Sequence, residues 1–418
     1  MGPSSQNSGR QQTLADTGSL SAVEPLSDLR VLVAHPGAEL YGSDRVMLES
    51  VVAMVHAGAA VDVTVPEPGP LVEELERAGA TVVVEPAFVL RKSMLRPRNW
   101  PSTVTSAFRA FGASRRLLGT RPDLVFVNTI TLPLWPLFAR ARAIPVLTHI
   151  HEAEAGASRL TLRALYLPHL WSTTTIANSE FSRSIAGRAY RSIARRTQVV
   201  YNGVAGPASA TPARVSLEGR RVRLTYVGRL SPRKGADLVI TAAADLIDQG
   251  LDVDVDILGA AFAGYEWFAD ELRDTAVRRG MGSRVRFLGF RDDVWATLEV
   301  ADIVVIPSNV GEPFGNTAVE AALAARPLVV SASSGLIEAT QGLPGVHRVR
   351  PEDALAIADA VREIIAHWPI QRDQAVAAAR LASIRFDPQR YRASIVELIA
   401  SMVRRPASRT SRPEPGGA

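Results

Sequence analysis

Short apolar runs alternate with amphipathic stretches along most of the chain. The runs Leu29–His35, Leu124–Asn128 and Ile303–Ile306 are apolar and rich in β-branched residues, which predicts buried strands. Near-continuous apolar strands separated by helices are typical of a parallel sheet covered on both faces. The other strands predicted in this way are Val61–Pro66, Thr81–Glu85, Pro145–His149, Thr174–Ala177, Val222–Val227, Val253–Leu258, Val285–Leu288 and Leu328–Val330.

The alternation is interrupted once, by a segment rich in Pro, Ala, Ser and Gly at 205–219. This segment is predicted to be a linker between two Rossmann-like α/β domains, at 29–204 and 220–387. Two such domains would face each other across a cleft. Because ligands of open parallel sheets bind beyond the carboxyl ends of the strands, functional residues are expected in the strand-to-helix turns.

The two ends of the chain differ from the rest in composition. Residues 1–28 and 405–418 are rich in small and polar residues and are expected to be disordered. Residues 388–404 have apolar positions at helical spacing, which predicts a C-terminal helix that packs on one of the two domains. No run approaches the roughly 20 apolar residues of a membrane span, and the expected location is cytoplasmic, with peripheral contact at the inner membrane face as an option.

The Cys content and the net charge of the chain limit the reactions and partners that are possible for it. The chain has no Cys, which excludes disulfides, thiolate nucleophiles and Cys-ligated zinc. Its net charge of +5 suits an anionic partner, but the basic residues are scattered, so no nucleic-acid partner is expected. Lys occurs only at Lys92 and Lys234, and Arg supplies the remaining positive charge.

Lys234 lies in a turn that follows the first strand of the second domain. The turn runs from Gly228 through Arg229 to Lys234 and Gly235, just before a predicted helix. Two cations beside a helix N-terminus form an anion site that suits a diphosphate. A solvated basic turn is the alternative, and the strand end, the glycines and the rarity of Lys argue against it.

A second turn combines two carboxylates with a helix start. Glu312 precedes Phe314-Gly315-Asn316-Thr317, and Glu320 lies in the first turns of the helix that begins near Asn316. The segment 314–317 is expected to aim backbone N–H groups into the cleft, where they suit phosphate. Carboxylates beside a phosphate site fit neutral vicinal hydroxyls, such as those of a ribose or a sugar, since a carboxylate accepts hydrogen bonds from both.

These motifs resemble the family 4 glycosyltransferases, retaining enzymes of the GT-B fold. The resemblance covers the second half in family order, and the first half departs from it where Tyr41-Gly42-Ser43-Asp44 replaces a Gly-Gly-x-Glu turn. The segments that carry it are Gly228-Arg229-Leu230 with Lys234-Gly235, Phe287-Leu288-Gly289, Glu312 with Glu320, Ser334-Gly335-Leu336-Ile337-Glu338 and Tyr201-Asn202-Gly203-Val204.

The resemblance implies transfer of a sugar from a nucleoside diphosphate sugar to a glycan or lipid-linked acceptor. The second domain would bind the donor and the first the acceptor. By motif position, Arg229 and Lys234 would hold the diphosphate, Glu320 the ribose, and Glu312 the region of the anomeric carbon. The turn at Gly42 would let backbone approach the phosphates. No cofactor or metal is implied.

Two histidines, His149 and His151, lie at the carboxyl end of the predicted strand Pro145–His149 in the first domain. The family often has a His at such a strand end, near the donor sugar, and this role is assigned to His151 as a second catalytic residue beside Glu312. His149 is the neighbouring alternative, and a structural histidine is the other alternative.

Two further patterns, the aspartates at 252–256 and the basic and aromatic segment 91–111, each suggest a function and also have an ordinary structural interpretation. Asp252, Asp254 and Asp256 alternate with Val as metal-binding motifs sometimes do, but a strand also places three such side chains on one face, and no metal site is expected. Residues 91–111 combine basic and aromatic side chains, which suits a membrane surface or an anionic lipid-linked acceptor. An ordinary exposed loop is the alternative.

Other functions use the same cleft. An epimerase or phosphorylase of the GT-B fold is one alternative. A protein that binds a nucleotide sugar without transferring it, and acts as a partner or scaffold, is another. The presence of Arg229, Lys234, Glu312 and Glu320 together favours a transferase.

Overall fold

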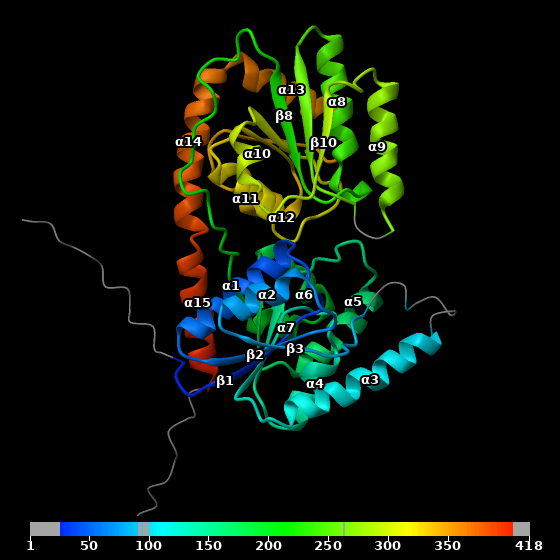
Figure 1. The fold of residues 1–418 in the computed structure, drawn as a ribbon, viewed down its shortest axis with the longest axis vertical. Helices are drawn as coiled ribbons and strands as arrows, with labels where there is room; N and C mark the ends of the chain where they lie inside the picture. The colour runs from blue at the N-terminus through cyan, green and yellow to red at the C-terminus, as the bar shows by residue number, and fades with distance from the viewer. Residues whose placement is uncertain (1–25, 91–93, 95–99, 262–263, 404–418) are drawn as a thin grey trace, which may run out of the picture.

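The computed structural model describes residues 26–90, 94, 100–261 and 264–403 and folds them into two α/β units (Figure 1). Of the two ends expected to be disordered, 1–25 and 405–418 lie outside the described residues. Leu26 is described: it is 1% exposed, and its backbone N–H donates to Ala57 O over 2.6 Å. The packed part of the chain therefore includes residues just before Leu29.

The first unit is built on a seven-stranded sheet in which every pair of strands is parallel, in the order β3-β2-β1-β4-β5-β6-β7. Its strands are β1 (Arg30–Ala34), β2 (Ala60–Val65), β3 (Thr81–Val84), β4 (Leu124–Val127), β5 (Val146–Ile150), β6 (Thr174–Ala177) and β7 (Thr197–Val199). Its helices are α1 (Gly42–His56), α2 (Pro70–Arg77), α3 (Trp100–Leu118), α4 (Leu134–Ala141), α5 (Arg159–Tyr166), α6 (Glu180–Ala189) and α7 (Arg191–Arg196).

The second unit repeats this plan with a six-stranded parallel sheet in the order β10-β9-β8-β11-β12-β13. Its strands are β8 (Val222–Val227), β9 (Val253–Leu258), β10 (Val285–Gly289), β11 (Ile303–Ile306), β12 (Leu328–Ser331) and β13 (Val346–Val349). The helices that follow them are α8 (Ala236–Asp248), α9 (Glu266–Arg278), α10 (Trp295–Glu299), α11 (Asn316–Leu323), α12 (Ser334–Ala339), α13 (Ala354–Ala366), α14 (Trp368–Arg385) and α15 (Pro388–Val403).

The prediction of two Rossmann-like units is confirmed. Strands β4, β11 and β12 are buried along their whole length, as their apolar sequences indicated. In both sheets the order reverses at one place, between β1 and β4 and between β8 and β11. In doubly wound sheets, ligands bind at this point of reversal, beyond the carboxyl ends of the strands.

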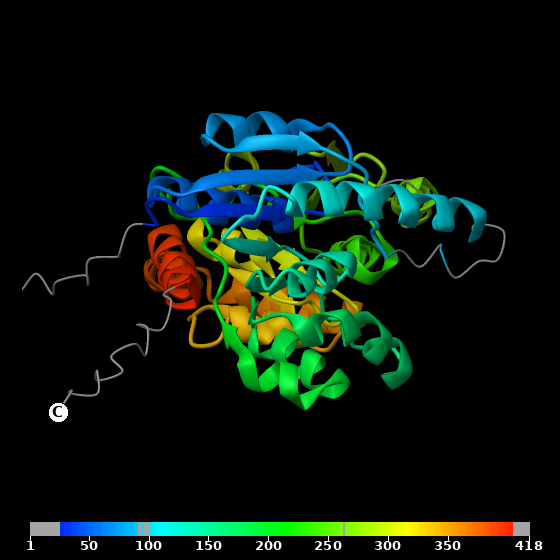
Figure 2. The same cartoon turned by 90° about the horizontal axis from the view of Figure 1, so that it is seen from below.

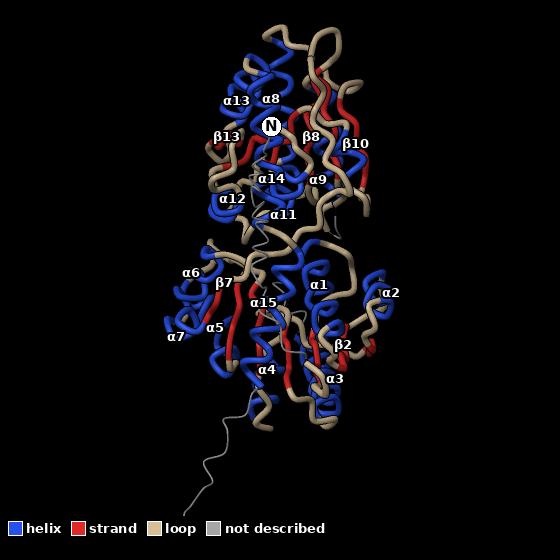
Figure 3. Tube along the Cα trace, turned by 90° about the vertical axis from the view of Figure 1, so that its left-hand side faces the viewer, coloured by secondary structure: helices blue, strands red, loops and turns tan. Residues whose placement is uncertain are grey.

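The C-terminal helix packs on the first unit. After α14 has run along the second unit, α15 continues down the molecule and lies against α1 (Figures 1 and 3). Tyr391, Ile395 and Ile399 of α15 are at most 2% exposed and belong to the same core as the strands of the first unit. The Tyr391 hydroxyl lies 2.6 Å from Ser50 Oγ of α1.

The predicted linker is also held in place. It has no helix or strand, yet the backbone carbonyl of Ala213 accepts a hydrogen bond from Arg372 of α14. The Arg214 guanidinium forms an ion pair with the buried Asp302 over 2.8 Å. The chain thus crosses between the units twice, through the linker and through the α14–α15 segment, and both segments are packed against the folded units.

Direct contacts join the units on both sides of the cleft. On one side, the Glu338 carboxylate accepts the backbone N–H groups of Glu180 and Phe181, at the N-terminus of α6. Acceptors at a helix N-terminus satisfy donors that have no partner within the helix. On the other side, the Tyr41 ring meets the Phe290 ring edge to face, with 5.7 Å between centroids.

The packing of α15 predicts a large effect of one truncation. Ile399→Ala should lower the free energy of unfolding by about 2–4 kcal/mol, because the side chain is fully buried and a cavity would remain. Ile384→Ala is the matched control, since Ile384 of α14 is 62% exposed and should cost under about 1 kcal/mol. Urea unfolding measures both, and equal losses would contradict the docking of α15.

Candidate active site

A cleft of about 570 Å³ lies between the facing edges of the two sheets. Its walls include the residues that directly follow the strands at both points of reversal: His35 after β1, Asn128 after β4, and Gly228 after β8. The expected site residues all line it, namely Gly42, His151, Arg229, Lys234, Glu312, Phe314, Gly315, Asn316, Thr317 and Glu320. The fold therefore brings together groups from both halves of the sequence.

An ion pair between the partly buried Lys234 and the buried Glu312 lies on the second unit's wall. Lys234 Nζ lies 2.7 Å from Glu312 Oε1, and Ser308 Oγ donates to the same oxygen over 2.9 Å. Burial acts to raise the pKa of Glu312, but the charge and hydrogen bond of Lys234 outweigh it, and the pKa is lowered. Glu312 is thus an ionised carboxylate that is already engaged by two donors.

Gly235 explains how Lys234 reaches this position. Its φ is +70°, and a Cβ at this residue would lie 2.2 Å from Pro307 O in the turn after β11. Only a residue without a side chain allows the two turns to approach so closely.

The Arg229 guanidinium lies over the ring of Tyr41 from the first unit, with 5.5 Å between Cζ and the ring centroid.

The N-terminus of α11 faces the cleft beside these cations. Gly315 precedes the helix with φ of +111°, and a Cβ on Gly42 of α1 would come within 3.3 Å of the Asn316 side chain. The two helix N-termini therefore lie close together across the cleft. The Phe314 ring points the other way, stacked on Tyr201 and buried, so only its backbone is suited to a ligand.

Glu320 differs from Glu312 although both line the same cleft. Burial raises the pKa of Glu320 to about 7, and Arg45 only partly opposes this shift. Within the described residues, no hydrogen bond is recorded to the Glu320 carboxylate. A desolvated carboxylate of this kind is suited to hydroxyl donors that a ligand brings, because their hydrogen bonds stabilise its ionised form.

The positions of His149 and His151 show which of the two faces the cleft. His151 lines the cleft, whereas His149 is fully buried behind it, with 3.7 Å between the two ring centroids. Burial lowers the pKa of His151 to about 3, so its imidazole is neutral. The ring of His149 also stacks at 6.5 Å on Tyr391 of α15, so the C-terminal helix supports the site from behind.

Several polar residues of the cleft were absent from the expected site, among them His35, Asp44, Asn128 and Glu152. His35 and Asn128 are the last residues of two predicted strands, a position at which function was expected, so a signal for them existed. Asp44 lies in the turn that departs from the family motif. It is buried, with Oδ1 3.0 Å from His35 Nε2, and Oδ2 accepts the backbone N–H of Tyr41.

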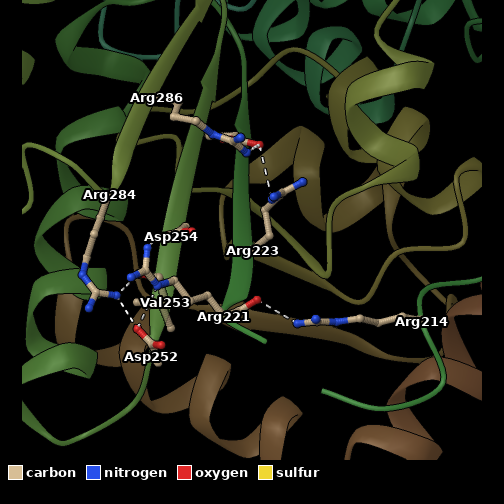
Figure 4. Close-up of polar contacts among 9 residues, drawn as sticks. Arg214, Arg221, Arg223, Asp252, Val253, Asp254, Arg284 and Arg286 are labelled. Atoms are coloured by element: carbon tan, nitrogen blue, oxygen red, sulfur yellow. Dashed lines mark hydrogen bonds and ion pairs between the residues drawn. The ribbon is translucent and has the colours of Figure 1, made fainter. Parts of the chain in front are cut away.

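Asp252, just before β9, and Asp254 and Asp256 of β9 form ion pairs with arginines on one face of the second sheet (Figure 4). Asp256, 1% exposed, accepts two hydrogen bonds from Arg286, at 2.7 and 2.8 Å. Asp252 pairs with Arg284. These carboxylates do not line the cleft, and no cluster of three or more potential metal ligands occurs in the described part of the chain.

Solved structures with the same architecture identify the fold. Anabaena HepE, solved with UDP, superposes with a TM-score of 0.74 at 23% identity, covering 89% of this chain and 100% of HepE. Sucrose-phosphate synthase of Thermosynechococcus elongatus superposes with a TM-score of 0.71 at 18% identity, covering 89% and 98%. Two facing Rossmann-like units with a cleft between them define the GT-B fold of glycosyltransferases.

Sequence comparisons give the family. Residues 41–205 match the model of Glycosyltransferase Family 4, and 221–367 match that of Glycosyl transferases group 1. Glycogen synthase of Mycobacterium tuberculosis is 30% identical over 313 residues, covering 69% of this chain and 72% of that enzyme. D-inositol 3-phosphate glycosyltransferase of Mycobacterium sp. is 29% identical over 211 residues, 48% of this chain and 47% of that protein. The chain belongs to the family 4 glycosyltransferases and is a transferase.

The ion pair between Lys234 and Glu312 generates a stability prediction. Lys234→Met should cost about 3–5 kcal/mol at pH 7.5, because it leaves the Glu312 carboxylate buried without a counter-charge. The loss should shrink at pH 5: there the unpaired Glu312, with its pKa raised by burial, takes up a proton.

Adding Glu312→Gln to Lys234→Met should recover part of the loss, since no buried charge then remains. Urea unfolding of the two single variants and the double variant at both pH values measures this coupling. Additive losses that do not change with pH would show that the pair does not interact in solution.

Proposed function

We propose that the protein is a retaining glycosyltransferase that moves a sugar from a nucleoside diphosphate sugar to a glycan or lipid-linked acceptor. The observation that carries the proposal is the convergence of Arg229, Lys234 and the N-terminus of α11 on one cleft, with Glu320 beside them. The solved complexes of Anabaena HepE with UDP and UDP-glucose support a donor of this class, with uridine as the first base to test.

The second unit, with residues 220–387, would bind the donor. Arg229, Lys234 and the backbone N–H groups of the first turn of α11 offer positive charge to a diphosphate. Glu320 would accept hydrogen bonds from the ribose hydroxyls. The acceptor would enter from the first unit, with residues 29–204, whose face of the cleft carries His151.

The chemistry follows from the charge that develops in the transition state. Cleavage of the sugar–phosphate bond gives the sugar oxocarbenium character and places negative charge on the leaving diphosphate, which fixed cations stabilise. The acceptor enters on the same face, and the departing phosphate takes its proton. Glu312 then acts through electrostatics rather than as a nucleophile, since Lys234 and Ser308 already engage its carboxylate. A trapped glycosyl adduct on Glu312 would refute this scheme.

The binding of nucleoside diphosphates tests the donor site. Of UDP, GDP, TDP and ADP, one should raise the unfolding temperature most, and Lys234→Ala should weaken its binding about 10- to 100-fold because a charged hydrogen bond is lost. Arg220→Ala, at an exposed position outside the cleft, is the control and should leave binding unchanged. Binding of none of the four would favour a scaffold protein over a transferase.

No divalent metal should be needed, because protein cations face the leaving group. Transfer with the matching diphosphate sugar should survive EDTA treatment and yield the anomeric configuration of the donor. Restoration of activity only by Mg²⁺ or Mn²⁺ would contradict the assignment of the diphosphate to Arg229 and Lys234.

The pKa of Glu320 predicts how donor affinity depends on pH. Because its pKa is raised to about 7 and a diol binds the ionised form, the affinity for the nucleoside diphosphate should rise between pH 6 and 8 and then level off. Glu320→Gln keeps the shape of the side chain and should weaken binding at pH 8 and flatten the profile. Calorimetry at four pH values measures this, and an unchanged profile in the variant would remove Glu320 from the ribose site.

We also propose that α3 contacts a membrane surface that carries the acceptor. Of residues 91–111, 91–93 and 95–99 lie outside the described residues, and from Trp100 onward the segment is a helix rather than a loop. It projects from the body of the first unit (Figure 2). Phe108 is 75% exposed on a helix that also carries the exposed Arg109 and Arg115, which suits an anionic interface. Among the described residues, no helix is both long and apolar enough to cross a bilayer.

Sedimentation with anionic liposomes at low salt tests this contact. Phe108→Ser should reduce the bound fraction several-fold, and 0.5 M salt should reduce it further, because both the apolar and the charged contributions are then weakened. Leu160→Ser is the control, since Leu160 is 79% exposed on α5, away from α3. Equal binding of the two variants would place any membrane contact elsewhere.

A further inference from the structure

Four side chains on the first unit's wall form a continuous hydrogen-bonded chain, here called the imidazole relay. Asp44 Oδ1 lies 3.0 Å from His35 Nε2, His35 Nδ1 lies 3.1 Å from Asn128 Nδ2, and Asn128 Oδ1 lies 2.9 Å from His151 Nε2. The four residues come from α1 and from the ends of β1, β4 and β5. Each is at most 9% exposed and lines the cleft.

The carboxylate sets the direction of the first hydrogen bond in the relay, and a His35 ring with a single proton passes this direction on to the others. Asp44 already accepts hydrogen bonds from the Tyr41 N–H and the Ser43 hydroxyl, and an ionised carboxylate only accepts. His35 Nε2 must therefore carry a proton, which makes Nδ1 of a neutral His35 an acceptor. Its partner is then the amide NH₂ of Asn128.

The roles of donor and acceptor in the hydrogen bond between Asn128 and His151 follow from this. Since the Asn128 nitrogen donates to His35, its oxygen is the atom that faces His151 and accepts. His151 Nε2 consequently carries the proton, and Nδ1 holds a lone pair. Within the described residues, the hydrogen bonds of the His151 ring all go through Nε2, so Nδ1 is the atom that the ring offers to a ligand.

We propose that Asp44, His35 and Asn128 are positioning residues that hold His151 in one tautomer, so that its Nδ1 accepts a hydrogen bond from a hydroxyl of the donor sugar. The proposal rests on the donor class proposed above. A lone pair in this place favours a hydroxyl and repels a carboxylate or a phosphate oxygen, so the relay also selects against anionic groups on the sugar at that position.

Two features keep the His151 ring in this state. Its lowered pKa, about 3, keeps it neutral through the physiological range, so the lone pair is not lost to protonation. The ring of His149, with its centroid 3.7 Å away, limits rotation of the His151 ring, and the His149 ring is itself stacked with Phe126 and with Tyr391. The ring contact with His149 and the hydrogen bond through Nε2 together hold the His151 ring in the orientation in which Nδ1 is available.

The tautomer can be tested without any activity. Long-range ¹H–¹⁵N NMR of the protein labelled at its seven histidines distinguishes a protonated ring nitrogen from one with a lone pair. A His151→Gln spectrum assigns the signals. His151 should have a protonated Nε2 and a bare Nδ1, and Asn128→Leu should give a mixture of tautomers. A protonated Nδ1 on His151 in the unaltered protein would overturn the proposal, since it means that the relay runs in the opposite direction from a charged His35.

Kinetics tests the contact with the sugar. Asn128→Leu should lower kcat/KM for the diphosphate sugar about 10- to 100-fold while the Kd of the nucleoside diphosphate is unchanged, because the relay touches only the sugar part. Thr175→Val is the control: it removes a buried hydrogen bond to Thr197 in the same sheet, away from the relay, and should leave kcat/KM unchanged. Equal losses in both variants would reduce the relay to a structural role.

A series of monodeoxy donor sugars locates the hydroxyl. One deoxy analogue should lose activity on the unaltered protein and lose little more on Asn128→Leu, since both changes remove the same interaction. If every analogue is affected equally in the two proteins, the hydroxyl contact is wrong even though transfer occurs. If no diphosphate sugar is a substrate, the proposed function fails, whereas the NMR result on the tautomer still stands.

Discussion

The site depends on a constraint of parallel sheets: the carboxyl ends of all their strands lie at one edge, and ligands bind among the strand-to-helix turns at this edge. Each unit of this protein has a single point of strand reversal, and the two are placed face to face. The position of one unit relative to the other therefore decides whether a site exists. Two connections set that position, the bound linker and the segment α14–α15, and Glu338 adds a contact across the cleft.

Within this cleft, similar burial has different consequences because the partners differ. Lys234 keeps Glu312 ionised, whereas burial raises the pKa of Glu320 to about 7 because Arg45 opposes the shift only in part. His151 is kept neutral mainly by burial, and His35 lowers its pKa further. Arg229 and Lys234 of the second unit thus present positive charge to the cleft, which suits a diphosphate, whereas His151 of the first unit presents a neutral acceptor, which suits a sugar hydroxyl.

The strands that line the core were predictable because their apolar runs are a local property of the sequence. β7 and β13 were not predicted, since both are short and partly polar and are defined by pairing with a distant neighbour. The candidate residues of the second unit followed from motif order, which is also local. The imidazole relay was not predicted: Asp44, Asn128 and His151 are far apart in sequence and meet only through the strand order β1-β4-β5. The docking of α15 likewise depends on contacts between the two ends of the chain.

The most direct test of the account is a crystal structure of the protein with its nucleoside diphosphate sugar. The account predicts the diphosphate at Arg229 and Lys234, the ribose hydroxyls on Glu320, and a sugar hydroxyl within hydrogen-bond distance of His151 Nδ1. A diphosphate bound away from Arg229 and Lys234, or a sugar that points away from the first unit, would contradict it.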